Sequence, residues 1–256
     1  MSLKNFKISP YLSIYGIVFF YMMLTGFAMF ILLKLEEYDY KYIIGFFEIV
    51  AFAFISYSIN KYYFSRINLE SPKLVGINST LFKSVVIGIL FASLLNFPYR
   101  IYATVKSGAL EYIILAFTPE KFIKSLGAGI FEEIIFRGTL LNFYNQKKKK
   151  YLGLVISSAI FCLIHAPNSF FGVDITLFYL LDMFIFGLLF GLIYLNYGLV
   201  TAITTHFVGN LLIGGFIQPT RYGSYYSFGI ALIICIWLFI RDRNKQKQVE
   251  PRKTIP

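Results

Sequence analysis

Long apolar stretches, separated by short polar and basic segments, run along almost the whole chain. The first extends from Ile8 to Leu33 without a charged residue, and similar stretches return at fairly even intervals. A transmembrane helix needs about 20 mainly apolar residues, because its backbone polar groups must be satisfied within the segment. The pattern therefore predicts an all-α polytopic membrane protein with eight spans, at residues 11–33, 42–59, 81–97, 119–143, 151–171, 176–196, 198–217 and 224–240.

Local signals mark several ends of these spans. A polar, basic connector is expected at 60–80, and Pro98 is expected to end the third span, because proline lacks the N–H that a helix interior needs. Thr118 and Pro119 form a typical helix start, with the threonine as N-cap and the proline at the first helical position. The lysine run at 147–150 is expected to stop the fourth span.

Composition supports this class of protein. The 256 residues are 57% hydrophobic and 14% charged, whereas a soluble domain is about a quarter charged. A water-soluble globule, a disordered protein and a disulfide scaffold are therefore excluded, and Cys162 and Cys235 are expected to be packing residues inside spans. The basic residues that give the net charge of +11 lie between apolar stretches and do not form a patch on a soluble face. We therefore expect the lipid bilayer, and not nucleic acid, as a partner.

The distribution of basic residues predicts the orientation in the membrane. With the N-terminus in the cytoplasm, 15 lysines and arginines fall on the cytoplasmic side and seven on the other side. Cytoplasmic segments of membrane proteins carry the excess of these residues. The pattern therefore favours eight spans with both termini inside.

The fourth span holds charged residues where a charge is costly, about 2.5–3.5 kcal/mol for each at mid-bilayer. Glu133 and Arg137 are four residues apart on one helix face and can pair. Glu132 lies about 100° around the helix and is left over. A salt-bridged helix with a snorkelling glutamate accounts for the pair but not for Glu132. Two adjacent carboxylates beside one cation should titrate differently, which can make one of them a general base.

The two histidines of the chain, His165 and His206, both fall in predicted spans. A single histidine on an apolar helix is usually a core residue, but two of them beside a glutamate pair indicate a polar cavity. His206 and Asn210 share a helix face at a spacing of four, and Pro167 is expected to kink or end the helix after His165.

Two further carboxylates lie in spans. We expect Glu48 to be hydrogen-bonded to a neighbouring helix, and Asp182 to lie near the outer end of the sixth span.

Three motifs lie on predicted spans four, five and seven: Glu-Glu-x-x-x-Arg at 132–137, Phe-x-x-x-His at 161–165 and His-x-x-x-Asn at 206–210. Together they resemble the motifs of the CPBP intramembrane proteases, the CAAX-protease and bacteriocin-processing (Abi) family that includes the Rce1-like, type II CAAX prenyl endopeptidases. The resemblance covers about 118–217. It implies a catalytic core there with a conical polar cavity formed by spans four to seven, preceded by spans one to three at 1–117 and followed by the last span and a basic cytoplasmic tail at 218–256.

The resemblance also implies a role for each motif residue. Glu132 and His165 would hold and deprotonate the attacking water, while His206 and Asn210 would stabilise the oxyanion. These roles suit the residue types, since a carboxylate can accept a proton and imidazole and carboxamide N–H groups can donate hydrogen bonds.

The remaining motif residues would support that machinery. Glu133 either shares a proton with Glu132 or holds Arg137, and both glutamates are treated as needed in the family. Phe161 would pack the imidazole of His165 in place instead of touching the substrate.

Zinc is the alternative cofactor. If a metal binds, Glu132, His165 and His206 would be its ligands, because carboxylates and imidazoles both ligate zinc. No His-Glu-x-x-His motif is present, however. The family has been described both as metalloproteases and as a metal-free glutamate type, and we expect a metal-free glutamic-type endopeptidase without cofactor.

The expected activity is cleavage of a membrane-associated protein or peptide, either lipidated or carrying a leader sequence. A non-catalytic scaffold or bacteriocin self-immunity protein of the same fold, and a proton-coupled carrier, stay open as alternatives. The abundance of Lys, Asn, Ile, Tyr and Phe is typical of a low-GC bacterium. It therefore favours the bacterial plasma membrane and disfavours prenylated substrates.

Overall fold

A computed structural model describes residues 9–34, 41–76, 79–107, 118–166, 175–215 and 221–249. Within these ranges the chain is helical and contains no strand. The elements are α1 (Pro10–Lys34), α2 (Lys41–Arg66), α3 (Leu81–Ser107), α4 (Pro119–Glu133), the π-helix η3 (Ile134–Leu141), α5 (Asn142–Gln146), α6 (Lys150–Ile164), α7 (Leu177–Tyr197), α8 (Leu199–Gly215) and α9 (Arg221–Val249).

The predicted all-helical fold is confirmed, and each predicted span overlaps a helical segment. The fourth span corresponds to one uninterrupted stretch made of α4, η3 and α5. Among the described residues, four helices are long and apolar enough to cross a membrane: α2, α3, α7 and α9. Shorter apolar helical stretches occupy Pro10–Thr25, Lys150–Ile164 and Leu199–Leu212. The count of eight spans and the cytoplasmic location of both termini stay predictions.

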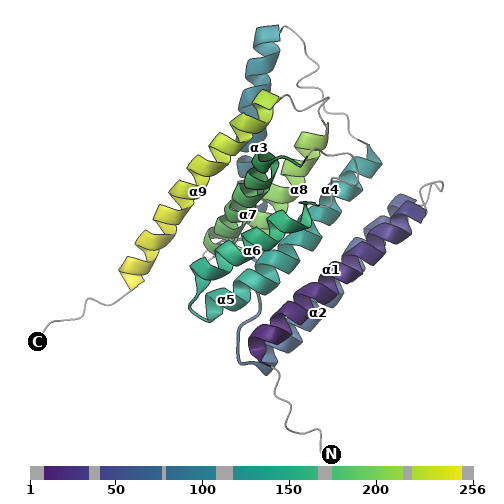
Figure 1. Ribbon diagram of the computed structural model, residues 1–256, viewed down its shortest axis with the longest axis vertical. Coiled ribbons are helices and arrows are strands. Elements are labelled where there is room, and N and C mark those ends of the chain that lie inside the picture. The colour runs from purple at the N-terminus through teal and green to yellow at the C-terminus, as the bar shows by residue number, and fades with distance from the viewer. Residues whose placement is uncertain are drawn as a thin grey trace, which may run out of the picture.

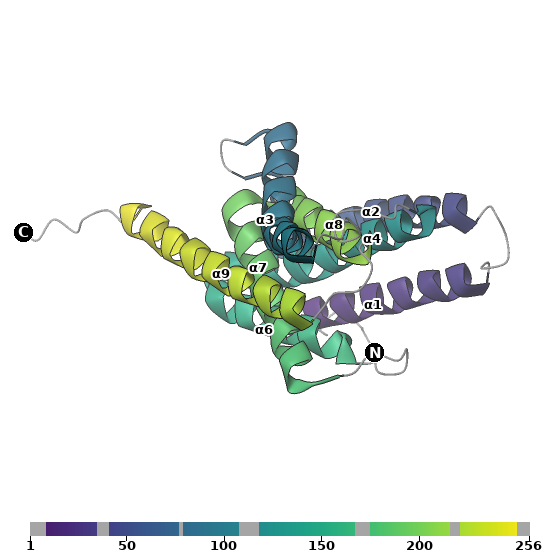
Figure 2. The same ribbon diagram turned by 90° about the horizontal axis from the view of Figure 1, so that it is seen from above.

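Helix α8 lies in the middle of the bundle and packs against α3, α4 and α7 (Figures 1 and 2). Helices α1 and α2 lie together on one side, where α2 contacts α4. Helix α9 lies on the opposite side against α7 and α3, and α6 packs on α7. The helices that carry the three motifs, α4, α6 and α8, are thereby gathered in the interior of the bundle.

Two predicted helix ends are wrong, and one predicted start is right. Helix α3 continues through Pro98 to Ser107, and α2 continues to Arg66 into the expected connector. Near the proline, Ser227 donates a hydrogen bond to the carbonyl of Leu95 at 3.1 Å. Neighbouring helices and hydroxyl side chains can satisfy backbone groups around an intrahelical proline, so it does not have to end a membrane helix.

The start of α4 follows its sequence signal. The side chain of Thr118 accepts a hydrogen bond from the amide of Lys121 at 3.2 Å, and Pro119 is the first helical residue. At the other end, the lysine run separates α5 from α6, with Lys148 at a φ of 58°.

Small residues allow the central helices to approach closely. A Cβ added to Gly187 of α7 would lie 2.9 Å from both Cα and Cβ of Ser158 on α6, and one added to Gly129 of α4 would lie 3.0 Å from Phe207 on α8. Membrane helices lack a hydrophobic force between them and associate through such close packing.

The substitution Gly187→Ala should therefore destabilise the protein. The added methyl group meets the backbone of α6, and overpacking of this kind costs about 1–3 kcal/mol. Thermal unfolding of the detergent-purified protein, followed by circular dichroism, should show a lower midpoint. Gly229→Ala on α9 is the matched control, because nothing lies within 4 Å of a Cβ there. Equal midpoints for the two variants would contradict the close contact between α6 and α7.

Candidate active site

The site begins at the junction of α4 with the π-helix η3, which the sequence did not predict. Inside η3, the hydroxyl of Thr139 donates to the carbonyl of Ile134, five residues earlier, at 2.9 Å. The side-chain amide of Asn60 on α2 donates to the same hydroxyl at 3.0 Å. Single turns of π-helix often occur at functional sites. Glu132 and Glu133 lie just before this π-helix, and Arg137 lies inside it.

Glu133 and Arg137 form the buried ion pair that their spacing predicts. Both side chains are 0% exposed, and Arg137 Nη1 donates to Glu133 Oε1 at 3.1 Å. Arg137 Nη2 donates to the backbone carbonyl of Gly187 on α7 at 2.9 Å. The guanidinium also lies 4.7 Å from the ring centroid of Phe161. The arginine thus links η3, α6 and α7 in the interior, where a charge needs both a counter-ion and hydrogen bonds.

Glu133 also binds His206. Its Oε1 lies 2.9 Å from Nδ1 of that histidine, while the ring of Phe190 stacks on the imidazole at 4.5 Å with an interplanar angle of 11°. A carboxylate paired with an arginine can only accept hydrogen bonds, so Nδ1 of His206 carries the proton. Nε2 therefore faces the other way, toward Glu132.

His165 is held in a similar way at the end of α6. Its Nδ1 lies 2.7 Å from the carbonyl of Phe161, which can only accept, so this nitrogen is also protonated. The ring of Phe161 lies 4.6 Å from the imidazole. Helix α6 ends at Ile164, before Pro167, which lies outside the described residues.

Glu132 lies between the two histidines. Its Oε2 is 4.0 Å from Nε2 of His165 and 3.9 Å from Nε2 of His206. The side chain is 21% exposed, yet Oε2 is buried and has no hydrogen-bond partner among the described residues. One carboxylate and two imidazoles from α4, α6 and α8 therefore converge on one point.

The spacing of these three groups bears on the metal alternative. Atoms about 4 Å apart can both hydrogen-bond one water at about 2.8 Å. A tetrahedral zinc with bonds near 2.0–2.1 Å would instead draw its ligand atoms to about 3.3 Å from each other. The described residues contain no cluster of three or more His, Cys, Asp or Glu side chains arranged to hold a metal. Glu132 Oε2 thus lies farther from each histidine nitrogen, at 4.0 and 3.9 Å, than two ligands of one zinc would lie from each other.

The structure places Asn210 less closely with the other motif residues. It lies on α8 one turn after His206 and is partly buried. Among the described residues, no hydrogen bond joins it to the two glutamates or the two histidines. Asn210 and His206 share one face of α8, because they are four residues apart.

Sequence reasoning missed the packing around the site and misjudged one carboxylate. Phe190 and the carbonyl of Gly187 carry no motif that would reveal their contacts with His206 and Arg137. Glu48 was expected to be hydrogen-bonded to a neighbouring helix, but its Oε2 is buried without a hydrogen-bond partner within the described ranges. Asp182 lies in the second turn of α7, and its Oδ1 also has no partner there. Cys162 and Cys235 are free, and neither is fully exposed.

A comparison with protein-family models gives a match. Residues 114–212 match the family model described as type II CAAX prenyl endopeptidase Rce1-like. Comparisons with curated proteins and with solved structures gave no match. The matched segment includes all three motifs and the helices that position them, and the apolar helices indicate an integral membrane protein. Residues 114–212 of this membrane protein are thus similar to the Rce1-like family model of the type II CAAX prenyl endopeptidases.

Proposed function

We propose that the protein is an intramembrane endopeptidase of the glutamic type, which hydrolyses a peptide bond with a water activated by Glu132 and His165. The observation that carries the proposal is the convergence of Glu132 Oε2 with the Nε2 atoms of His165 and His206, at 4.0 and 3.9 Å. The family match supports a protease independently of this geometry.

The first step is removal of a proton from water. With Nδ1 of His165 donating to the carbonyl of Phe161, Nε2 of the neutral ring is a hydrogen-bond acceptor. Glu132 offers a second acceptor, Oε2, which no other described group engages. A water between the two would be oriented by both, and Glu132 takes its proton as the oxygen attacks the peptide carbonyl. The proton then passes to the nitrogen of the leaving amine.

The second requirement is stabilisation of the oxyanion. Because Nδ1 of His206 donates to Glu133, Nε2 can donate only when the ring is doubly protonated. The Glu133 carboxylate fixes the orientation of this ring, as a buried carboxylate does beside a catalytic histidine in other hydrolases. In our proposal His206 faces the oxyanion and donates to it from Nε2 when the ring carries both protons, Asn210 supplies a second donor, and Arg137 holds Glu133 in place. Glu133 is a positioning residue for His206, which is a more specific role than the sequence allowed.

The substrate is a protein or peptide that reaches the site within the membrane. Helices α4, α6 and α8 surround the convergence point, so a soluble folded protein would not reach it unless a segment entered the bundle. We propose no cofactor, because the three polar groups can supply the base and the donors by themselves.

Substitution of Glu132 should abolish cleavage and leave the fold intact. Loss of a general base usually costs a factor of about 10²–10⁴ in rate. In Glu132→Gln, the processing of membrane proteins and peptides in cells, measured as new chain ends by mass spectrometry, should fall to background, while the variant accumulates in the membrane like the wild type. Glu120→Gln, on the exposed first turn of the same helix and paired with Lys124, is the matched control.

Other outcomes of that experiment separate the alternatives. Unchanged processing in Glu132→Gln would remove Glu132 as the base. If neither Glu132→Gln nor His206→Gln alters processing while uptake of a solute changes, the protein would be a carrier. If neither processing nor uptake changes but partner proteins are lost from the purified complex, it would be a non-catalytic scaffold.

Substitution of Glu133 should affect both activity and stability. Glu133→Gln leaves the buried Arg137 without its counter-ion, and breaking a buried pair costs about 3–5 kcal/mol. We expect a lower thermal midpoint together with loss of cleavage, whereas Glu132→Gln loses cleavage alone. A Glu133→Gln variant of normal stability would contradict the structural importance of this pair.

If the site contains no metal, chelators should not change the activity. Activity of the purified protein is expected to remain after prolonged dialysis against a strong zinc chelator, because no step of the proposal uses a metal. Activity that disappears on chelation and returns with added zinc would overturn the glutamic-type proposal and make Glu132, His165 and His206 the candidate ligands.

A further inference from the structure

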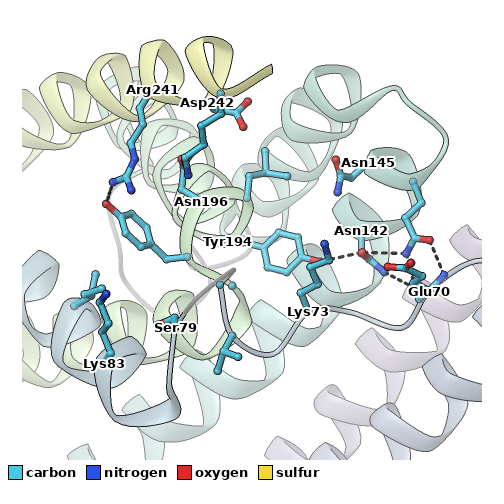
Figure 3. A pocket seen from close by; sticks show the side chains of 18 of the residues that line it. Glu70, Lys73, Ser79, Lys83, Asn142, Asn145, Tyr194, Asn196, Arg241 and Asp242 are labelled. Carbon is cyan, nitrogen blue, oxygen red and sulfur yellow. Dashed lines mark hydrogen bonds between the residues drawn. The ribbon is translucent and has the colours of Figure 1, made fainter. Parts of the chain in front are cut away.

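A polar cavity lies at the end of the bundle where α5 and α7 finish and α3 and α8 begin (Figure 3). Its volume is about 380 Å³, and it shares no lining residue with the catalytic centre. Along the continuous helix, Asn142 in its wall is ten residues from Glu132. The cavity is therefore separate from the catalytic centre.

Positively charged side chains outnumber carboxylates among the residues that line the cavity. Four cations line the cavity: Lys73, Lys83, Arg241 and Lys245. The two carboxylates in the lining are Glu70 and Asp242, and Asp242 is already engaged by Lys150 at 2.6 Å and by the hydroxyl of Tyr151 at 2.9 Å. Within the part of the chain that the structure describes, none of the four lining cations forms an ion pair. The cavity thus holds a surplus of positive charge.

Neighbouring side chains position two of these cations. Arg241 donates to the hydroxyl of Tyr197, and its guanidinium lies 4.7 Å from the centroid of that ring. Lys245 donates to Oδ1 of Asn196 at 3.3 Å. Figure 3 shows Lys83 and Asp242 on the same side of the cavity as Arg241, with the carboxylate of Glu70 at the opposite edge. An anion on the Arg241 side would therefore meet cations from α3 and α9 and lie away from Glu70.

The segment that carries Lys73 is anchored to the bundle. The carbonyl of Lys73 accepts a hydrogen bond from the amide of Leu199 at 3.0 Å, and the amide of Val200 donates to the carbonyl of Leu74 at 2.9 Å. Gly198 permits this approach with a φ of +91°, because a Cβ there would lie 2.6 Å from the backbone of residue 75. These hydrogen bonds thus hold the backbone of Lys73 in place beside the start of α8.

The rest of the lining suits binding and not catalysis. Serine, tyrosine and amide side chains provide further hydrogen-bond donors, and neither histidine nor cysteine is among the lining residues. The cavity volume lies in the usual range for small-ligand sites, about 300–1,000 Å³.

The position of the cavity indicates where its ligand comes from. Its walls are the terminal turns of α3, α5 and α7, together with the connector after α2. The predicted orientation puts these ends at the cytoplasmic surface of the membrane, at the depth of the phosphate groups of anionic lipids. We propose that this cavity binds a phosphate group, carried by the headgroup of an anionic phospholipid or by a soluble phosphate ester. This inference does not depend on the proposed protease activity.

The test uses the full-length protein purified in a neutral detergent. Phosphatidylglycerol, phosphatidylcholine and glycerol 3-phosphate are the probes, with retention of lipid measured by native mass spectrometry and binding measured as a rise in the thermal midpoint. The cavity variant is Lys73→Gln/Lys83→Gln, which removes two exposed cations. The matched control is Lys61→Gln/Arg66→Gln, which removes two exposed cations from the same end of α2 outside the cavity.

The wild type and the control variant should prefer phosphatidylglycerol to phosphatidylcholine, and the cavity variant should bind phosphatidylglycerol at least tenfold more weakly. Each cation near an anionic surface contributes about fivefold. A response to glycerol 3-phosphate as well would identify the phosphate group as sufficient, and a response to the lipid alone would identify the membrane as the source. Equal retention by the cavity variant and the wild type, or an equal loss in the control variant, would overturn the proposal. Lys83→Gln alone, with the unfolding midpoint of the wild type and about fivefold weaker binding, separates lost binding from lost folding.

Discussion

One buried carboxylate, that of Glu133, connects the structural and the chemical parts of the site. Its Oε1 accepts hydrogen bonds from Arg137 at 3.1 Å and from His206 at 2.9 Å, and its side chain is inaccessible to solvent. The arginine extends the connection to the backbone of α7. Four helical elements, α4, η3, α7 and α8, are thus held by charge-assisted hydrogen bonds, which are strong where water is excluded. The orientation of both the arginine and the histidine depends on this single group.

The two adjacent glutamates have different surroundings, because only Glu133 is paired with Arg137. Glu133 points into the packed interior, where its Oε1 accepts from Arg137 and His206, while Glu132, about 100° around the helix, is partly exposed and has its Oε2 between two histidines. A carboxylate bound by an arginine and a histidine can hold both in place, and one that no cation of a lysine or arginine engages can take a proton. In the proposed mechanism this difference in surroundings assigns different roles to two chemically identical side chains.

Much of the fold follows from local pattern. Apolar stretches of sufficient length must be helical in a membrane, so the helical segments could be placed from hydrophobicity, and Thr118 with Pro119 marked the start of α4 correctly. Pro98 did not end α3, and Glu48 did not find the expected partner, because both outcomes depend on what neighbouring helices offer at that point. The π-helix could not be predicted from the sequence either, because it involves a contact with Asn60, which is far away along the chain.

The sequence by itself determined which residues could perform chemistry in this protein. Charged and imidazole groups are costly in a bilayer and therefore rare there, so their presence in predicted spans pointed to Glu132, Glu133, Arg137, His165 and His206. Only the tertiary structure decided which nitrogen of each histidine faces Glu132, that Phe190 stacks on His206, and that four cations from three segments surround one cavity. These facts depend on distances between helices that are remote along the chain, and periodicity within one helix carries no information about them.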